Sequence, residues 1–140
     1  MVAPSLTAEA LTRIYAENFA DWVRDLGLEV TQASPDYIVS RMANTPRLAR
    51  VGGMVSGQAL MAMADTTMVL ATAARFGRFR PVATTNFDCQ FLRPCVGDWI
   101  VCRADIVRSG KSLAFVKAEL VSEPSGKSVA QAQATFFLPD

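Results

Sequence analysis

The chain has 140 residues, enough for one domain and too few for a second hydrophobic core. It contains no histidine, which excludes Ser-His-Asp and Cys-His nucleophiles, a histidine general base and a metal held by histidine. Fourteen basic and thirteen acidic side chains leave a net charge of +1, whereas nucleic-acid-binding domains are usually strongly basic, so no nucleic-acid partner is expected. Catalysis would have to come from a carboxylate, a lysine, a cysteine or the backbone.

The N-terminal part of the chain predicts an amphipathic helix over residues 7–26. Apolar side chains such as Leu11 and Tyr15 recur there at steps of three and four, which aligns them along one face of a helix. Thr7 suits the N-cap, and Gly27 suits a left-handed residue that ends the helix. The first residues lack the basic and apolar segments of a secretory signal, so a cytoplasmic location is expected.

Strand patterns occur on both sides of the middle of the chain. Residues 28–42 surround the turn Ser34-Pro35-Asp36 and predict a hairpin. Residues 82–138 predict four antiparallel strands joined as a meander, at 82–92, 99–107, 113–121 and 128–138. In the first of these strands, strict alternation places Thr84 and Asn86 on the same face.

The segment between these regions predicts a central helix at about residues 57–75, because it is dominated by Ala, Met and Leu. From Gly52 to Ala74 it has no polar face and one charged residue, Asp65, so a sheet or lipid must enclose it. A membrane span is unfavourable, since an aspartate near its centre costs about 2.5–3.5 kcal/mol, and it would leave the other elements unexplained. We therefore expect no membrane association but an α+β domain in which one antiparallel sheet curves around the central helix.

Two motifs lie in these expected elements. Ser56-Gly57-Gln58 opens the central helix, and Met63-Ala64-Asp65 follows within it. Phe91-Leu92-Arg93-Pro94 ends the first long strand and is followed by Gly97-Asp98. In this order, the motifs resemble the His-Gly-Gly turn, the Leu-x-Asp sequence and the Phe-Leu-Arg-Pro-like turn of PaaI-like (phenylacetate-degradation-type) acyl-CoA thioesterases, which have the hotdog fold.

The resemblance implies a hotdog fold and the hydrolysis of an acyl-CoA or related thioester, with no cofactor and no metal expected. Three positions depart from the family pattern. Ser56 stands where histidine is usual, Gln58 replaces the second glycine, and Arg50 stands where relatives often carry an asparagine near the substrate carbonyl. We expect Ser56, Gln58 and Arg50 to contact substrate, and Asn86 is a weaker candidate for the same role.

The chemistry requires a donor for the carbonyl oxygen and a group that activates water. Free N–H groups at a helix start, reinforced by the helix dipole, can hold the oxygen, so we expect the Gly57 and Gln58 amides to do so. Asp65, alone in an apolar helix, should be partly desolvated, which raises the pKa of a carboxyl group and favours a general base acting on water. A nucleophilic Asp65 is the alternative mechanism.

Asp65 lies about 12 Å from Gly57 along the helix axis, so one chain need not place both on a single carbonyl. In the family that the motifs resemble, the acid of one subunit faces the oxyanion amides of the other. Thr84 aligns there with a hydroxyl that the partner subunit places near the attacking water. Unpaired edge strands of a curved sheet also favour a homodimer or homotetramer.

Other interpretations compete with these assignments. Asp65 could be a buried acid paired with an arginine, or it could mark an exposed gap in an otherwise covered helix. Thr84 could be an ordinary strand residue. A non-catalytic acyl-CoA or lipid-binding hotdog protein is the alternative function, whereas hotdog hydratases are excluded because they use a histidine. The phosphates of CoA could meet any of several basic residues, namely Arg75, Arg78, Arg80, Arg108 and Lys111.

Overall fold

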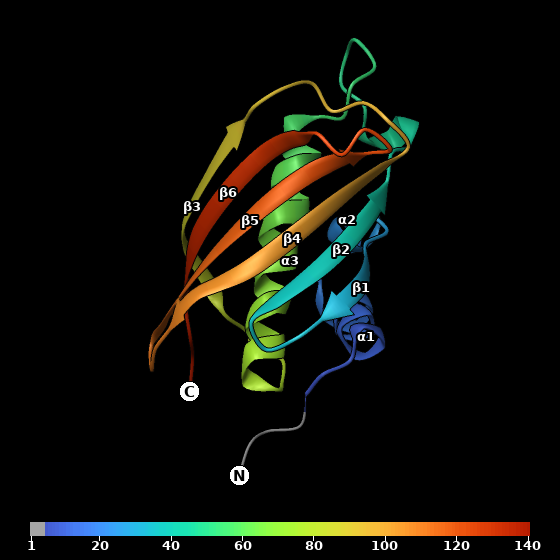
Figure 1. The fold of residues 1–140 in the computed structure, drawn as a ribbon. Coiled ribbons are helices and arrows are strands. Elements are labelled where there is room, and N and C mark those ends of the chain that lie inside the picture. Colours follow the sequence, from blue (N-terminus) through green and yellow to red (C-terminus); the bar gives the residue numbers. More distant parts are fainter. Residues whose placement is uncertain (1–4) are drawn as a thin grey trace.

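One long helix, α3 (Gly57–Phe76), runs along the inner face of a curved six-stranded antiparallel sheet (Figure 1). The computed structural model describes residues 5–140. This is the α+β arrangement expected from the sequence. The other elements are α1 (Ala8–Asn18), α2 (Asp21–Arg24), β1 (Glu29–Ala33), β2 (Tyr37–Ala43), the 3-10 helix η1 (Pro46–Leu48), β3 (Ala83–Phe91), β4 (Trp99–Ser109), β5 (Leu113–Glu123) and β6 (Ser128–Phe137).

The ends of α3 follow from local chemistry at each terminus. The Ser56 hydroxyl accepts a hydrogen bond from the Ala59 amide at 3.2 Å and so caps the start of the helix. Gly77 ends it in the left-handed conformation, with φ of 75°. No helix in residues 5–140 combines the length and the apolarity needed to cross a membrane.

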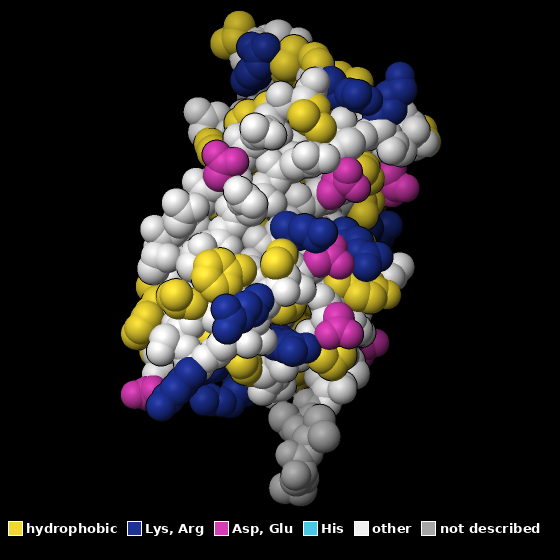
Figure 2. All heavy atoms as spheres, turned by 60° about the vertical axis from the view of Figure 1, so that its left-hand side comes forward, with side chains coloured by type: hydrophobic (Ala, Val, Ile, Leu, Met, Phe, Trp, Pro, Cys, Tyr) yellow, Lys and Arg dark blue, Asp and Glu magenta, His cyan; other side chains and the backbone are white. Residues whose placement is uncertain are grey.

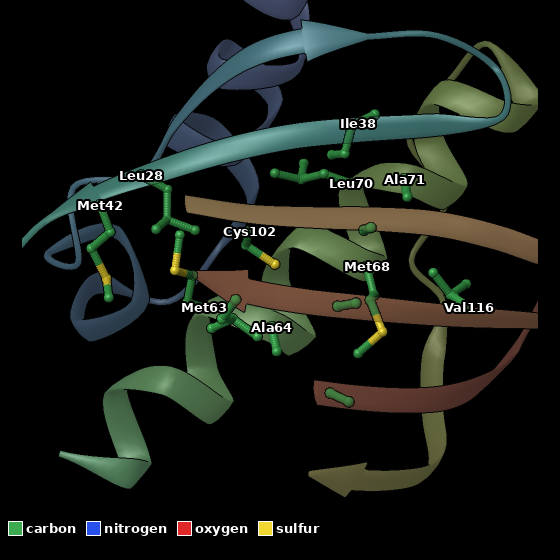
Figure 3. Packing of buried hydrophobic residues seen from close by; sticks show 14 of the residues in the cluster. Leu28, Ile38, Met42, Met63, Ala64, Met68, Leu70, Ala71, Cys102 and Val116 are labelled. Atoms are coloured by element: carbon green, nitrogen blue, oxygen red, sulfur yellow. The ribbon is translucent and has the colours of Figure 1, made fainter. Parts of the chain in front are cut away.

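The hydrophobic core fills the space between α3 and the sheet. Met63, Met68 and Leu70 of α3 are fully buried and belong to the same core cluster as inner side chains such as Ile38 of β2 and Val116 of β5 (Figure 3). Each fully buried side chain of this size contributes about 1.5–3 kcal/mol relative to leaving it in water. The burial of most of α3 explains why its sequence lacks a polar face.

The strand order corrects the expected four-stranded meander. β4, β5 and β6 are paired consecutively, but β3 pairs with β6, so the sheet order is β1-β2-β4-β5-β6-β3. The link between β3 and β4 is too long for a hairpin turn, and backbone hydrogen bonds fix it along the end of the sheet, with Leu92 donating to Val129 at 2.9 Å and Asp98 to Glu123 at 2.9 Å. β1 and β3 are therefore the two edge strands, on opposite sides of Figure 1.

The prediction of a single helix over residues 7–26 is wrong, because this region forms two helices, α1 and α2. Thr7 does cap α1, accepting from the Ala10 amide at 3.0 Å, but the helix ends at Phe19, whose backbone is extended (ψ of 158°). The ring of Phe19 lies between those of Tyr15 and Phe79, with centroid distances of 5.8 and 6.1 Å. These aromatic contacts accompany the break between α1 and α2. The spacing of apolar residues in the sequence did not predict this break.

Candidate active site

One side of α3 is left partly uncovered, and it faces the edge strand β3. Gly57 and Asp65 contact Phe91 and Thr84 of β3, respectively, and Met61 lies between them on the same helix face. The inner side chains of β3 are half-buried or exposed, whereas those of β5 are buried. We call this surface the α3–β3 strip; its members are Gly57, Met61, Asp65, Thr84, Phe87, Cys89 and Phe91.

Asp65 occupies one end of the strip. Its side chain is half-buried, and its Oδ1 accepts a hydrogen bond from the Thr84 hydroxyl at 3.1 Å. Burial raises the pKa of the Asp65 carboxyl above its ordinary value, and the Thr84 hydrogen bond partly opposes that rise. None of the five ion pairs in the described part of the chain includes Asp65, so the alternative of an acid paired with arginine is wrong.

A β-bulge in β3 decides which side chains reach Asp65. The pairing of β3 with β6 shifts between Thr84 and Asn86, so Thr84 lies opposite the fully buried Phe136, and Asn86 lies opposite Thr135 on the outer face. Thr84 therefore joins the inner face, where its hydroxyl reaches Asp65 of its own chain. The prediction that Asn86 shares a face with Thr84 is wrong, because strict alternation does not survive a bulge.

Free backbone donors occupy the other end of the strip, at the start of α3. Ser56 caps the Ala59 amide, and the Leu60 amide donates to the Ser56 carbonyl at 3.2 Å. The Gly57 and Gln58 amides donate to no acceptor within residues 5–140. Two unsatisfied N–H groups at the positive end of a 20-residue helix form a suitable site for a developing oxyanion.

Phe91 covers Gly57, a contact that the sequence did not reveal. A Cβ atom at position 57 would lie 3.3 Å from Cζ of Phe91, so a side chain larger than hydrogen would press on the ring. Phe91 belongs to a motif noted in the sequence, but its position over Gly57 depends on how β3 is placed beside α3. Only the tertiary structure shows this relation.

The expected substrate contacts lie around the same end of α3. The hydroxyl of Ser56 is engaged as the helix cap, and Gln58 is exposed. Arg50 is exposed in a turn beside the helix start, where its guanidinium donates to the Val51 carbonyl at 2.9 Å and the Ala49–Val55 bridge holds the turn. The structure thus brings these three residues close to the free amides in the chain, while Asn86 lies elsewhere.

Figure 2 shows basic side chains along this face from its upper to its lower end, with acidic ones between them. At the lower end, where α3 finishes, Arg75 pairs with Asp36 at 3.0 Å, and Arg80 donates to the Pro139 carbonyl and lies 5.0 Å from the centroid of the Phe76 ring. These two arginines have structural partners. Within residues 5–140, no group of three His, Cys, Asp or Glu side chains is arranged to hold a metal ion.

A long helix enclosed by a curved six-stranded antiparallel sheet is the arrangement of the hotdog fold, and here the helix carries free amides at its start and one half-buried carboxylate. The family model of the thioesterase superfamily matches residues 52–129, which is more than half of the chain. The chain belongs to this superfamily. The match begins just before α3 and ends at the start of β6, so it includes both ends of the α3–β3 strip.

Two curated relatives match nearly the whole chain. A provisionally named esterase of Thermoplasma acidophilum is 28% identical over 130 residues, covering 93% of this chain and 96% of that protein. Human acyl-coenzyme A thioesterase 13 is 26% identical over 132 residues, covering 93% of this chain and 90% of the human protein. Together with the family, these names support thioester hydrolysis as the general reaction.

Solved structures confirm the fold. Zebrafish thioesterase superfamily member 2 superimposes with a TM-score of 0.85 at 24% identity, covering 96% of this chain and 100% of that one. A thioesterase from Haemophilus influenzae gives a TM-score of 0.87 at 21% identity, covering 99% of this chain and 94% of that one. The expected hotdog fold is therefore correct.

Proposed function

We propose that the protein is an acyl-CoA thioesterase in which Asp65 activates water and the Gly57 and Gln58 amides hold the carbonyl oxygen. The observation that carries this proposal is the position of Asp65: half-buried, without a basic partner in the described residues, and hydrogen-bonded to Thr84 on the same strip as the free amides. A carboxylate in this environment is a stronger base than one in water.

The reaction follows from these groups. The Asp65 carboxylate takes a proton from water as the water oxygen attacks the thioester carbon. The carbonyl oxygen becomes an oxyanion, stabilised by the amides at the helix start. Collapse of this intermediate breaks the carbon–sulfur bond, and the leaving thiolate takes the proton from Asp65. This gives a carboxylic acid and the free thiol and returns Asp65 to its ionised form. Thr84 acts by orienting the carboxylate of Asp65.

The distance along α3 supports a site completed by a second copy. Asp65 and Gly57 are eight residues apart, about 12 Å along the helix axis, which is far for groups acting on one carbonyl. β3 pairs with β6 on one side, and its other edge has no strand beside it in residues 5–140. A twofold axis near the middle of β3 would pair two such edges and place Asp65 of one copy opposite Gly57 of the other. A homodimer, or a homotetramer of two such dimers, is the proposed assembly.

Three further residues are assigned to substrate binding near the carbonyl end. Arg50 carries a positive charge in the turn beside the helix start, and Gln58 presents an exposed side chain there. Ser56 contributes by fixing the helix start through its cap. Their common position next to the free amides supports this assignment.

The test is a thiol-trapping assay with acyl-CoA substrates of short, medium, long and aryl acyl groups. Asp65→Asn keeps the size of the side chain and an oxygen that can accept from Thr84, so it should fold and bind acyl-CoA but lose about 10²–10⁴-fold in kcat. Asp88→Asn is the matched control, because Asp88 is an exposed aspartate on the outer face of β3 and should leave the rate unchanged.

Equal hydrolysis rates for the wild type and Asp65→Asn would contradict the assignment of a catalytic role to Asp65. If the wild type binds acyl-CoA but cleaves none of these substrates, the non-catalytic acyl-CoA or lipid-binding function is the correct one. The Ser56-Gly57-Gln58 turn, with its two departures from the family pattern, is the feature that favours that second function.

A further inference from the structure

Phe91 lies at the boundary between the α3–β3 strip and the exposed loop that follows β3. It pairs with Ala130, which is fully buried, so both side chains are on the inner face of the sheet. Alternation places Phe91 in line with Cys89 and Phe87, the other inner side chains of this part of β3. Even so, Phe91 is 49% exposed, which is unusual for a large aromatic residue on an inner face.

The ring of Phe91 approaches the backbone of Gly57 with its outer edge. From the Cβ position of residue 57, the distances to Cζ, Cε1 and Cε2 are 3.3, 3.5 and 3.9 Å. That position is two bonds from the Gly57 amide nitrogen, one of the two free donors. The exposed ring therefore lies beside the residue that supplies one of the two free amides.

The direction of the substrate follows from what surrounds the helix start. The thiol portion of CoA is long and polar, and it must lead to solvent, which it meets at the exposed loops that carry Val51 and Val96, with exposed fractions of 93% and 61%. With the thiol portion in that direction, the acyl group would extend the opposite way along the strip, past Met61. Phe91 would then lie beside the first carbon after the carbonyl, because its ring lies beside Gly57.

We propose that Phe91 is a specificity-determining residue, whose ring disfavours acyl groups branched at the carbon next to the thioester carbonyl. This inference rests on the proposed thioesterase function and adds a substrate preference to it. An unbranched acyl group passes the ring edge with a CH₂ group, whereas a branched one must place an extra methyl group where the ring already fills the space beside Gly57.

The test compares two substrates that differ only in this branch, butanoyl-CoA and 2-methylpropanoyl-CoA. For the wild type, we expect kcat/KM to be higher for butanoyl-CoA. Phe91→Ala should raise the branched-to-straight ratio of kcat/KM by about tenfold or more, the usual effect of one methyl group in a fitted apolar site. Phe91→Leu, which keeps apolar packing, should raise it less. Phe115→Ala is the matched control, since Phe115 is 37% exposed on the outer face, and it should leave the ratio unchanged.

The outcomes separate this inference from the proposed function. An unchanged ratio in folded Phe91→Ala and Phe91→Leu, or an equal loss of rate on both substrates, overturns the role of Phe91 while leaving the thioesterase function in place. A wild type that cleaves neither substrate, nor any other acyl-CoA of the panel, overturns the proposed function itself, and the inference with it. Thermal unfolding of each variant establishes that it is folded.

Discussion

A half-buried carboxylate costs folding free energy when it is ionised, and Asp65 is such a group. Because its pKa is higher in the folded chain than in the unfolded one, its stabilising contribution is complete below the unfolded-state pKa and is lost as pH rises through the folded-state pKa. Asp65→Asn should therefore be more stable than the wild type at pH 7–8, and the difference should shrink toward zero below about pH 4. Thermal unfolding across this pH range measures it, and a less stable variant at neutral pH would contradict the assignment.

The hydrogen bond from Thr84 acts on the same carboxyl in the opposite direction. It favours the ionised form and so lowers the pKa of Asp65 from the value that burial alone would give. Thr84→Val should move the acidic limb of the pH dependence of kcat/KM to higher pH, because the base then stays protonated over a wider range. Thr84→Ser, which retains the hydroxyl, should leave that limb in place. A limb unmoved in Thr84→Val would show that Thr84 does not control the titration of Asp65.

Single residues also show the limits of reading the sequence. The partial burial of Asp65 and the position of Gly57 at the helix start could be predicted, because each residue stands out against its neighbours and falls in a recognisable motif. Asn86 could not be placed, since one bulge reverses the face of every residue beyond it. The contact of Phe91 with Gly57 joins residues far apart in the chain, and no local pattern encodes it.

At the scale of elements, α3 depends on how it begins. Ser56 is the N-cap of α3. It also belongs to a turn held against η1, because its backbone amide donates a hydrogen bond to the Leu48 carbonyl at 2.7 Å. Ser56→Ala removes the capping oxygen and should lower the free energy of unfolding by about 1 kcal/mol, while Ser56→Asp, another good cap, should restore most of it. Urea unfolding measures both values. Equal stability of all three proteins would mean that the cap contributes nothing.

Helices and strands could be predicted where the periodicity of apolar residues is strong, whereas the pairing of the strands could not. The strands and α3 lie close to their expected ranges because alternation and residue type determine them locally. The place of β3 at the sheet edge beside β6 depends on the path of residues 92–98, which is fixed by hydrogen bonds to distant strands. The split between α1 and α2 depends likewise on Phe79, a residue from another part of the chain.

For the whole molecule, the position of β3 has the largest consequence. Had β3 paired with β4 as a meander, it would take the place beside β4 that β2 occupies, and β6 would be left at the edge where β3 lies. At the edge, β3 has one side with no strand beside it among residues 5–140, with the acid near one end and the free amides near the other. This arrangement makes a site shared across a twofold axis geometrically consistent.

A shared site predicts complementation between two inactive variants. Asp65→Asn lacks the base, and Gly57→Leu places a side chain against the Phe91 ring and blocks the amides. In a mixed dimer, one of the two sites combines the intact Asp65 of one chain with the intact Gly57 of the other. Random mixing gives half mixed dimers with one working site each, so co-expression should restore about a quarter of wild-type activity.

The measurement is the thioesterase rate of the co-expressed pair, with differently tagged chains purified to quantify the mixed dimer. Each variant expressed alone gives the background. If the acid and the amides of one chain acted together instead, every site in the mixture would lack one of them, and the mixture would stay at that background. Recovery in proportion to the fraction of mixed dimer is expected only when the two groups come from different chains, because only then does mixing create an intact site.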